Sequence, residues 1–176
     1  MTDVSMTIGG ERVTAAASFG VINPATGKVH ADAPDCSRQQ LDRAFEAASG
    51  AFAGWSADLD ARRAAMKAAA KAIGAAAETV GPVLTAEQGK PIASAIMESH
   101  ALSYWLHYFA RLEMPTEVIQ DDEQAYAEVV RRPMGVVAAI TPWNFPLCWR
   151  AGNSVPRCWP ATPSFSSRRP TRLAAP

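Results

Sequence analysis

The chain has 176 residues, of which 48% are apolar, and it carries 17 Lys and Arg against 17 Asp and Glu. This apolar fraction is typical of a globular protein, and the zero net charge gives no electrostatic reason to expect nucleic acid or a membrane as a partner. The sequence contains no run of eighteen apolar residues, so no segment is expected to span a bilayer, and no secretory signal is recognised after Met1. Because Cys36, Cys148 and Cys158 also lack Cys-x-x-Cys spacing, we expect a reduced, cytoplasmic protein.

Short strands and turns are predicted before residue 36. Residues 6–8 and 11–14 read as two strands around the turn Gly9-Gly10. Further on, Pro24 and Gly27 are typical of a β-turn between the apolar flanks at Val21 and Val29.

Two helices are predicted next. Ser37 is a plausible N-cap for the first, which is expected to end at Gly54-Trp55. The second begins near Asp58, is rich in alanine, and is expected to break at Gly74 or at Gly81-Pro82. A short helical turn over residues 83–88 should then stop at Gly89. The expected apolar positions are Leu41, Ala44, Phe45, Ala48 and Phe52 in the first helix, and Leu59, Met66 and Ile73 in the second.

A third, long helix is predicted to open at Pro91, where a missing N–H costs nothing, and to end at Met114-Pro115. His100 and His107 would lie on one face about 10.5 Å apart, too far to share a metal ion. With His30 isolated in the sequence, no metal site is predicted. The expected buried side consists of Ile92, Ile96, Ser99, Leu102, Leu106 and Phe109.

Two strands of different character follow. Residues 124–132 alternate partly and carry charge, which is typical of an exposed edge strand. Residues 135–140 form an unbroken apolar run that indicates a parallel strand covered on both faces. Thr141-Pro142 ends this strand, and Pro146 braces the turn beyond it. Ligands of open α/β sheets bind beyond the carboxyl ends of strands, and there the amide of Asn144 could stabilise a developing oxyanion. The alternative is a proline-capped core strand with Trp143 as filler.

The segment 133–147, with its sequence Pro-Trp-Asn-Phe-Pro, resembles the first dinucleotide-domain strand and Asn loop of the NAD(P)-dependent aldehyde dehydrogenases. The blocks Asn-Pro-Ala-Thr-Gly at 23–27 and Glu-Gln-Gly-Lys-Pro at 87–91 resemble the same family. The resemblance implies that Asn144 donates to the aldehyde oxygen. It also implies that Ile140, Thr141, Pro142 and Trp143 lie against the nicotinamide of NAD or NADP. Glu87 and Lys90 are interpreted as solvated charges at a helix–turn–helix joint, without a chemical role.

The fold class implied is α/β, the N-terminal part of the aldehyde dehydrogenase fold with an irregular C-terminal tail. Residues 1–120 would be the helical part of the cofactor-binding domain and 121–132 a strand of the oligomerisation arm. Residues 133–147 would be the first Rossmann-like strand and the Asn loop, and 148–176 a non-homologous, disordered tail. The parent enzyme is expected to act on a small-molecule aldehyde as a homodimer or homotetramer.

Residues 148–176 contain five Arg and no Asp, Glu or Lys, which leaves 12 Lys and Arg against 17 acids, a net charge of −5, in residues 1–147. When the last base of each codon is joined to the first two of the next, Cys158-Trp159 must encode Leu and Trp159-Pro160 must encode Ala. The next junctions permit Gly-Asn-Thr-Phe-Val-Leu-Lys-Pro-Ser, which is similar to the sequence following the Asn loop in the family. We interpret the tail as an out-of-frame translation; the alternative is a divergent basic tail.

Three expectations follow from this interpretation. The strand at 135–140 would lack a parallel neighbour and present an apolar edge, so poor solubility is expected. The chain would lack the nucleophile, the general base and the cofactor-binding glycines of the family, so it should neither hold the cofactor nor oxidise aldehydes by itself. Cys148 and Cys158 are treated as incidental. The alternative function is a non-catalytic remnant that acts as an interaction module.

Overall fold

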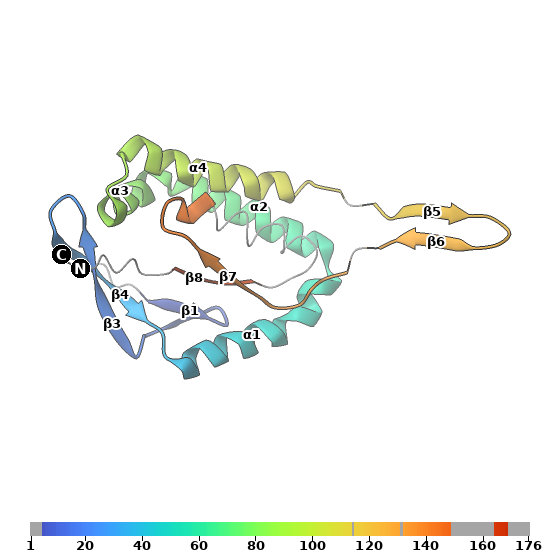
Figure 1. Ribbon diagram of the computed structural model, residues 1–176, viewed down its shortest axis with the longest axis horizontal. Coiled ribbons are helices and arrows are strands. Elements are labelled where there is room, and N and C mark those ends of the chain that lie inside the picture. The colour runs from blue at the N-terminus through green and yellow to red at the C-terminus, as the bar shows by residue number, and fades with distance from the viewer. Residues whose placement is uncertain (1–4, 114, 131, 149–163, 169–176) are drawn as a thin grey trace.

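The computed structural model describes residues 5–113, 115–130, 132–148 and 164–168 (Figure 1). Helices and short strands alternate in groups along the chain, which confirms the predicted α/β class. The strands are β1 Met6–Ile8, β2 Glu11–Val13, β3 Ala17–Asn23, β4 Lys28–Asp35, β5 Glu117–Asp121, β6 Tyr126–Val129, β7 Val137–Thr141 and β8 Ser164–Arg168. The helices are α1 Arg38–Ala57, α2 Leu59–Ala75, α3 Ala77–Gln88 and α4 Ile92–Phe109.

Both predicted N-terminal turns are confirmed. β1 pairs antiparallel with β2, and Gly9 and Gly10 adopt the positive φ angles of 62° and 85° that the tight turn requires. β3 pairs antiparallel with β4 around the turn that begins at Asn23, whose Oδ1 accepts a hydrogen bond from the N–H of Ala25 at 2.9 Å. Local turn chemistry is therefore enough to place these strands.

The predicted start of α1 is confirmed, but its predicted end is wrong. Ser37 is the N-cap, and it forms a reciprocal capping box with Gln40. The helix continues through Gly54 and Trp55 to Ala57. A single glycine weakens a helix without breaking it. The helix ends instead at Asp58, which leaves the helical conformation to cap α2 through the N–H of Ala61 at 2.8 Å.

The break between α2 and α3 lies later than Gly74 and earlier than Gly81-Pro82, so both predicted positions are wrong. α3 runs through Gly81 and Pro82 instead of beginning at residue 83. The reason is tertiary, because α3 packs along α4 and Gly81 lies directly against Ile96. The predicted stop at Gly89 is confirmed, since Gly89 has a φ of 74° and its N–H donates to the carbonyl oxygen of Thr85.

α4 follows Pro91 as predicted, but it ends at Phe109, before the predicted Met114-Pro115. Of the positions predicted to be buried, Ser99, Leu102 and Leu106 are buried, Ile96 and Phe109 are half-buried, and Ile92 is 46% exposed. The helix packs against α2 and α3, and Ser103 Oγ donates to the carbonyl oxygen of Ala70 at 2.8 Å. The central core cluster consists of Met66, Ala70, Leu102, Leu106 and Ala110, with Ala69, Ile73, Phe109 and Leu147 packed on it.

The antiparallel hairpin of β5 and β6 projects away from the rest of the molecule (Figure 1). β6 is shorter than the predicted strand 124–132, and β5 was not predicted. Every residue of β5 is exposed, so the strand has no buried face from which a sequence pattern could arise.

β7 differs from the prediction in two respects. Ala139 and Thr141 are buried whereas Ala138 and Ile140 are exposed, so one face is covered and not both. β7 also pairs in parallel with β8, so the expectation that it would lack a parallel neighbour is wrong. Pairing satisfies the backbone groups that a bare edge would leave open. β8 lies within the expected disordered tail, whose remaining residues, 149–163 and 169–176, are outside the described residues.

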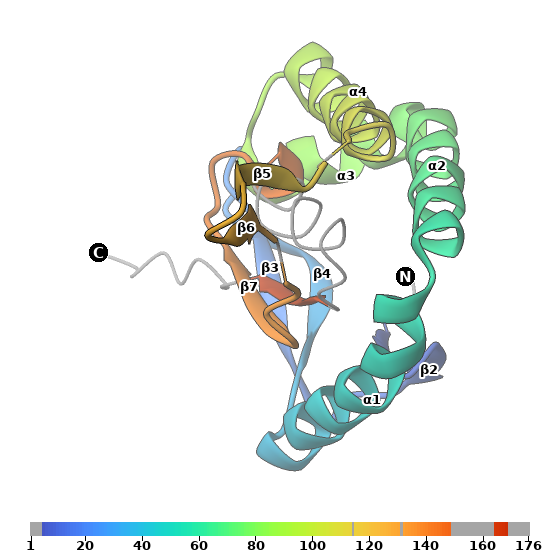
Figure 2. The same cartoon turned by 90° about the vertical axis from the view of Figure 1, so that its right-hand side faces the viewer.

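The strands β3, β4 and β7 lie between α1 at one end and the group of α2, α3 and α4 at the other (Figure 2). No helix in the described part of the chain is both long and apolar enough to cross a membrane. The arrangement places the carboxyl end of β7 beside the joint between α3 and α4.

Candidate active site

The chain leaves β7 through a rigid turn that carries Asn144. Thr141 is buried, Pro142 is half-buried, and the next three residues are exposed before a short helical turn begins at Pro146. Asn144 therefore lies just beyond the carboxyl end of the parallel strand β7 and is itself exposed, and its role as an oxyanion donor stays a prediction. The alternative, a proline-capped core strand with Trp143 as filler, does not agree with the 68% exposure of Trp143.

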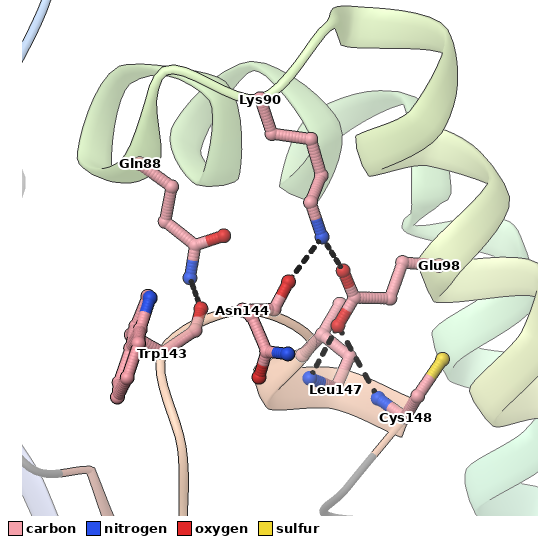
Figure 3. A network of polar contacts seen from close by, with 7 residues as sticks. All are labelled: Gln88, Lys90, Glu98, Trp143, Asn144, Leu147 and Cys148. Carbon is pink, nitrogen blue, oxygen red and sulfur yellow. Dashed lines mark hydrogen bonds and ion pairs between the residues drawn. The ribbon is translucent and has the colours of Figure 1, made fainter.

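Side chains from the α3–α4 joint hold the backbone of this turn (Figure 3). Gln88 Nε2 donates to the carbonyl oxygen of Trp143. Lys90 Nζ donates to the carbonyl oxygen of Asn144 at 2.9 Å and lies 4.2 Å from the centre of the Phe145 ring. Because Gly89 between them has a positive φ, the chain turns sharply out of α3 between Gln88 and Lys90.

A carboxylate on α4 completes the arrangement. Glu98 forms an ion pair with Lys90 through Oε2, and its Oε1 accepts hydrogen bonds from the N–H groups of Leu147 at 2.7 Å and Cys148 at 3.3 Å (Figure 3). The Glu98 side chain is 1% exposed and that of Lys90 is 12% exposed. The prediction that Lys90 is a solvated charge is therefore wrong, and Glu87 too is half-buried.

No role was predicted for Glu98 or Gln88, and Lys90 was predicted to be solvated although its side chain is 12% exposed. The Glu-Gln-Gly-Lys-Pro block marked two of these positions. The periodicity of α4 does not indicate that the distant N–H groups of Leu147 and Cys148 donate hydrogen bonds to Glu98. One signal was available, because Glu98 lies four residues before Leu102, which was expected to be buried, and buried carboxylates are rare unless paired.

The same charges act on Cys148. Burial raises the pKa of its thiol, the negative charge of Glu98 raises it further, and Lys90 opposes the shift. The thiol form is therefore favoured over the reactive thiolate. Cys148 also lines an open, apolar hollow of about 420 Å³ beside the loop. The hollow is bounded by Ala93, Ser94, Met97, Glu98, Ala101, Phe145 and Cys148.

The four residues predicted to meet a cofactor differ in exposure. Ile140 is 63% exposed and Trp143 is 68% exposed, so both offer apolar surface at the end of β7 on which a flat ring could lie. Thr141 is 4% exposed, so it offers almost no surface to a ligand. Contact of these residues with a nicotinamide ring stays a prediction. Among the described residues, no group of three or more His, Cys, Asp or Glu side chains could hold a metal ion.

Comparison with known proteins gives an independent assignment. The sequence model of the aldehyde dehydrogenase family matches residues 13–158, a range that runs past Leu147 into the expected non-homologous tail. A probable aldehyde dehydrogenase from a Pseudomonas species is 34% identical over 144 residues, which are 81% of this chain and 30% of that protein. A 3-sulfolactaldehyde dehydrogenase from Pseudomonas putida is 36% identical over 133 residues, which are 73% of this chain and 27% of that protein.

Solved structures agree. The succinate-semialdehyde dehydrogenase of Burkholderia pseudomallei is 32% identical and superposes with a TM-score of 0.86 over 94% of this chain and 36% of that one. A double mutant of the betaine aldehyde dehydrogenase of Staphylococcus aureus, in complex with NAD+, is 25% identical with a TM-score of 0.85 over 96% of this chain and 36% of that one. The chain thus spans about 30% of the first curated relative that it matches.

Proposed function

This chain belongs to the aldehyde dehydrogenase family, and we propose that its parent enzyme oxidises an aldehyde to a carboxylic acid with NAD or NADP. The observation that carries the proposal is the exposed amide of Asn144 at the carboxyl end of β7. Its backbone carbonyl is already bonded to Lys90, so the position of the turn does not depend on the side chain.

The role of Asn144 follows from its donor group. In the proposed reaction a cysteine thiolate of the parent enzyme attacks the aldehyde carbon, and negative charge develops on the carbonyl oxygen. The Asn144 amide N–H donates to that oxygen and stabilises the charge. NAD or NADP, when bound, would supply the acceptor for the hydride that leaves the former aldehyde carbon, and a glutamate of the parent enzyme would activate the water that hydrolyses the thioester. By resemblance to the family, the segment of Ile140, Thr141, Pro142 and Trp143 would lie against the nicotinamide, with Ile140 and Trp143 offering the exposed side chains.

The tail supports the reading-frame interpretation at one point. β8, Ser164–Arg168, lies where the shifted frame permits Val-Leu-Lys-Pro. Val, the first residue that this frame permits there, is enriched in strands, whereas Ser is not. We therefore keep the proposal that residues 148–176 are translated out of frame. The nucleotide sequence across the Leu147 codon decides it, and the proposal is wrong if no one-base slip restores Leu-Ala-Gly-Asn-Thr.

A single assay tests the activity. The 176-residue polypeptide should reduce neither NAD+ nor NADP+ in the presence of short aldehydes, because one oxyanion donor accelerates nothing without a nucleophile. The frame-restored gene product should turn over, and Asn144→Ala in that product should lower kcat by about 10²–10³. Turnover by the 176 residues alone, or an Asn144→Ala enzyme with full activity, would contradict the proposal.

A second function is favoured by one feature, the projecting hairpin of β5 and β6 with Ile119 67% and Tyr126 61% exposed. In a homodimeric or homotetrameric parent this hairpin would be the oligomerisation arm. In a non-catalytic remnant it would be the surface that binds another protein. Recovery of the short polypeptide from its source cells in a stable complex with one partner would favour the remnant over the enzyme.

A further inference from the structure

The buried ion pair of Glu98 and Lys90 has no part in the reaction proposed above. Charges in an interior cost free energy unless they are paired and their remaining donors and acceptors are satisfied. The two side chains are 1% and 12% exposed, respectively. Their remaining hydrogen bonds go to one place, the backbone that follows β7.

The contacts bracket Asn144. On one side Lys90 holds its carbonyl oxygen at 2.9 Å, and on the other Glu98 holds the N–H of Leu147 at 2.7 Å and that of Cys148 at 3.3 Å. The Leu147 side chain also packs on the α2–α4 core cluster. None of these contacts involves the Asn144 side-chain amide, so the turn is fixed without it (Figure 3).

We propose that Glu98 and Lys90 are positioning residues that hold the Asn144 turn, and thereby its amide, in one place relative to β7. An oxyanion donor acts only when it is held within about 0.5 Å of its working geometry by supporting side chains. This inference rests on the proposed role of Asn144. It goes beyond that role, because it assigns two charged residues to the reaction that touch neither substrate nor cofactor.

The stoichiometry of hydrogen bonds supplies a sharp test. A carboxylate has two acceptor oxygens, so Glu98 can serve Lys90 with one and the two N–H groups with the other. The side-chain amide introduced by Glu98→Gln has one acceptor oxygen and cannot serve both. If Lys90→Met is added, no ammonium competes, and that single oxygen is again available to the N–H groups.

Amide hydrogen exchange on the 176-residue polypeptide measures this directly. In Glu98→Gln the N–H groups of Leu147 and Cys148 should exchange at least about tenfold faster, relative to the core N–H groups of Ala70 and Leu102. In the double variant with Lys90→Met they should return to within about threefold of the wild type. Glu78→Gln, at an exposed position of α3, is the matched control and should change neither.

Two results would overturn the inference. The first is equal acceleration at Leu147, Cys148 and the core, which would mean that the pair supports only global stability. The second is unchanged exchange at Leu147 and Cys148 in Glu98→Gln. If Glu98→Gln alone does not fold, the double variant with Lys90→Met still tests the proposal. Fast exchange at the N–H groups of Leu147 and Cys148, together with slow exchange at the core N–H groups, would then contradict the proposal. No aldehyde or cofactor enters this experiment, so its failure is distinct from failure of the proposed activity.

Discussion

At the scale of a single residue, the pKa of the Cys148 thiol depends on the charges around the Asn144 turn. Its thiol lies beside Glu98 at the end of the turn, where burial and the negative carboxylate raise its pKa and the ammonium of Lys90 partly opposes them. The folded chain therefore keeps this proton to a higher pH than the unfolded chain does. As pH rises through the thiol range, the free energy of unfolding falls, and the contribution is lost above the folded pKa.

This predicts a shifted pH profile for alkylation. In a Cys36→Ser, Cys158→Ser background, the rate at which iodoacetamide modifies Cys148 should reach half its maximum at a higher pH in the folded chain than in denaturant. Adding Glu98→Gln removes one cause of the raised pKa and should move the folded midpoint down. Equal midpoints in the folded and denatured chains would show that the environment of Cys148 is not the one described.

At the scale of elements, the contact of α3 with α4 depends on Gly81. A Cβ built at this position would lie 2.5 Å from Ile96 Cγ1 and 3.4 Å from the Ile96 backbone nitrogen. Real Cβ atoms do not come within 2.5 Å of a side-chain carbon, so Ile96 would have to change its conformation or the two helices would have to move apart. Gly50 in α1 has nothing within 4 Å of its Cβ position and is exposed.

The two glycines should therefore respond in opposite directions to the same substitution. Gly81→Ala should lower the free energy of unfolding by about 1–3 kcal/mol, because the clash outweighs the gain in helix propensity. Gly50→Ala should raise it by about 0.5–1 kcal/mol, because it reduces backbone entropy without a new contact. Urea denaturation of both variants checks this. A stabilised Gly81→Ala would mean that α3 and α4 do not approach as closely as described.

The contrast between these helices shows what the sequence could predict. Ser37, Asp58 and Gly89 act on their own neighbours, so the N-cap at Ser37, the helix start near Asp58 and the helix stop at Gly89 were readable in the chain. The passage of α3 through Pro82 was not, because it depends on packing against α4. Asn144 was predicted for the same local reason, a strand stopped by proline. The contacts of Glu98 and Lys90 were not predicted, because they form between segments that are distant in the sequence.

At the scale of the whole molecule, large apolar side chains remain exposed in separate areas. One lies on α4, where Tyr104, Trp105 and Tyr108 are 64%, 42% and 46% exposed. A second is the hairpin, with Val118 and Ile119 50% and 67% exposed. A third is the end of β7. Exposed apolar side chains in such numbers favour association with other chains, and the chain spans about 30% of its first matched relative.

We therefore expect the 176-residue polypeptide to bind an apolar fluorescent dye and to associate at concentrations on the order of micromolar and above. Sedimentation velocity at increasing concentration measures the association. Ile119→Lys places a charge on the exposed hairpin and should move the onset to higher concentration, since a charge on an edge strand opposes pairing with another chain. Thr79→Lys adds the same charge at an exposed position of α3 and should leave the onset unchanged. A polypeptide that stays monomeric and does not bind the dye would show that these surfaces are covered within the chain itself.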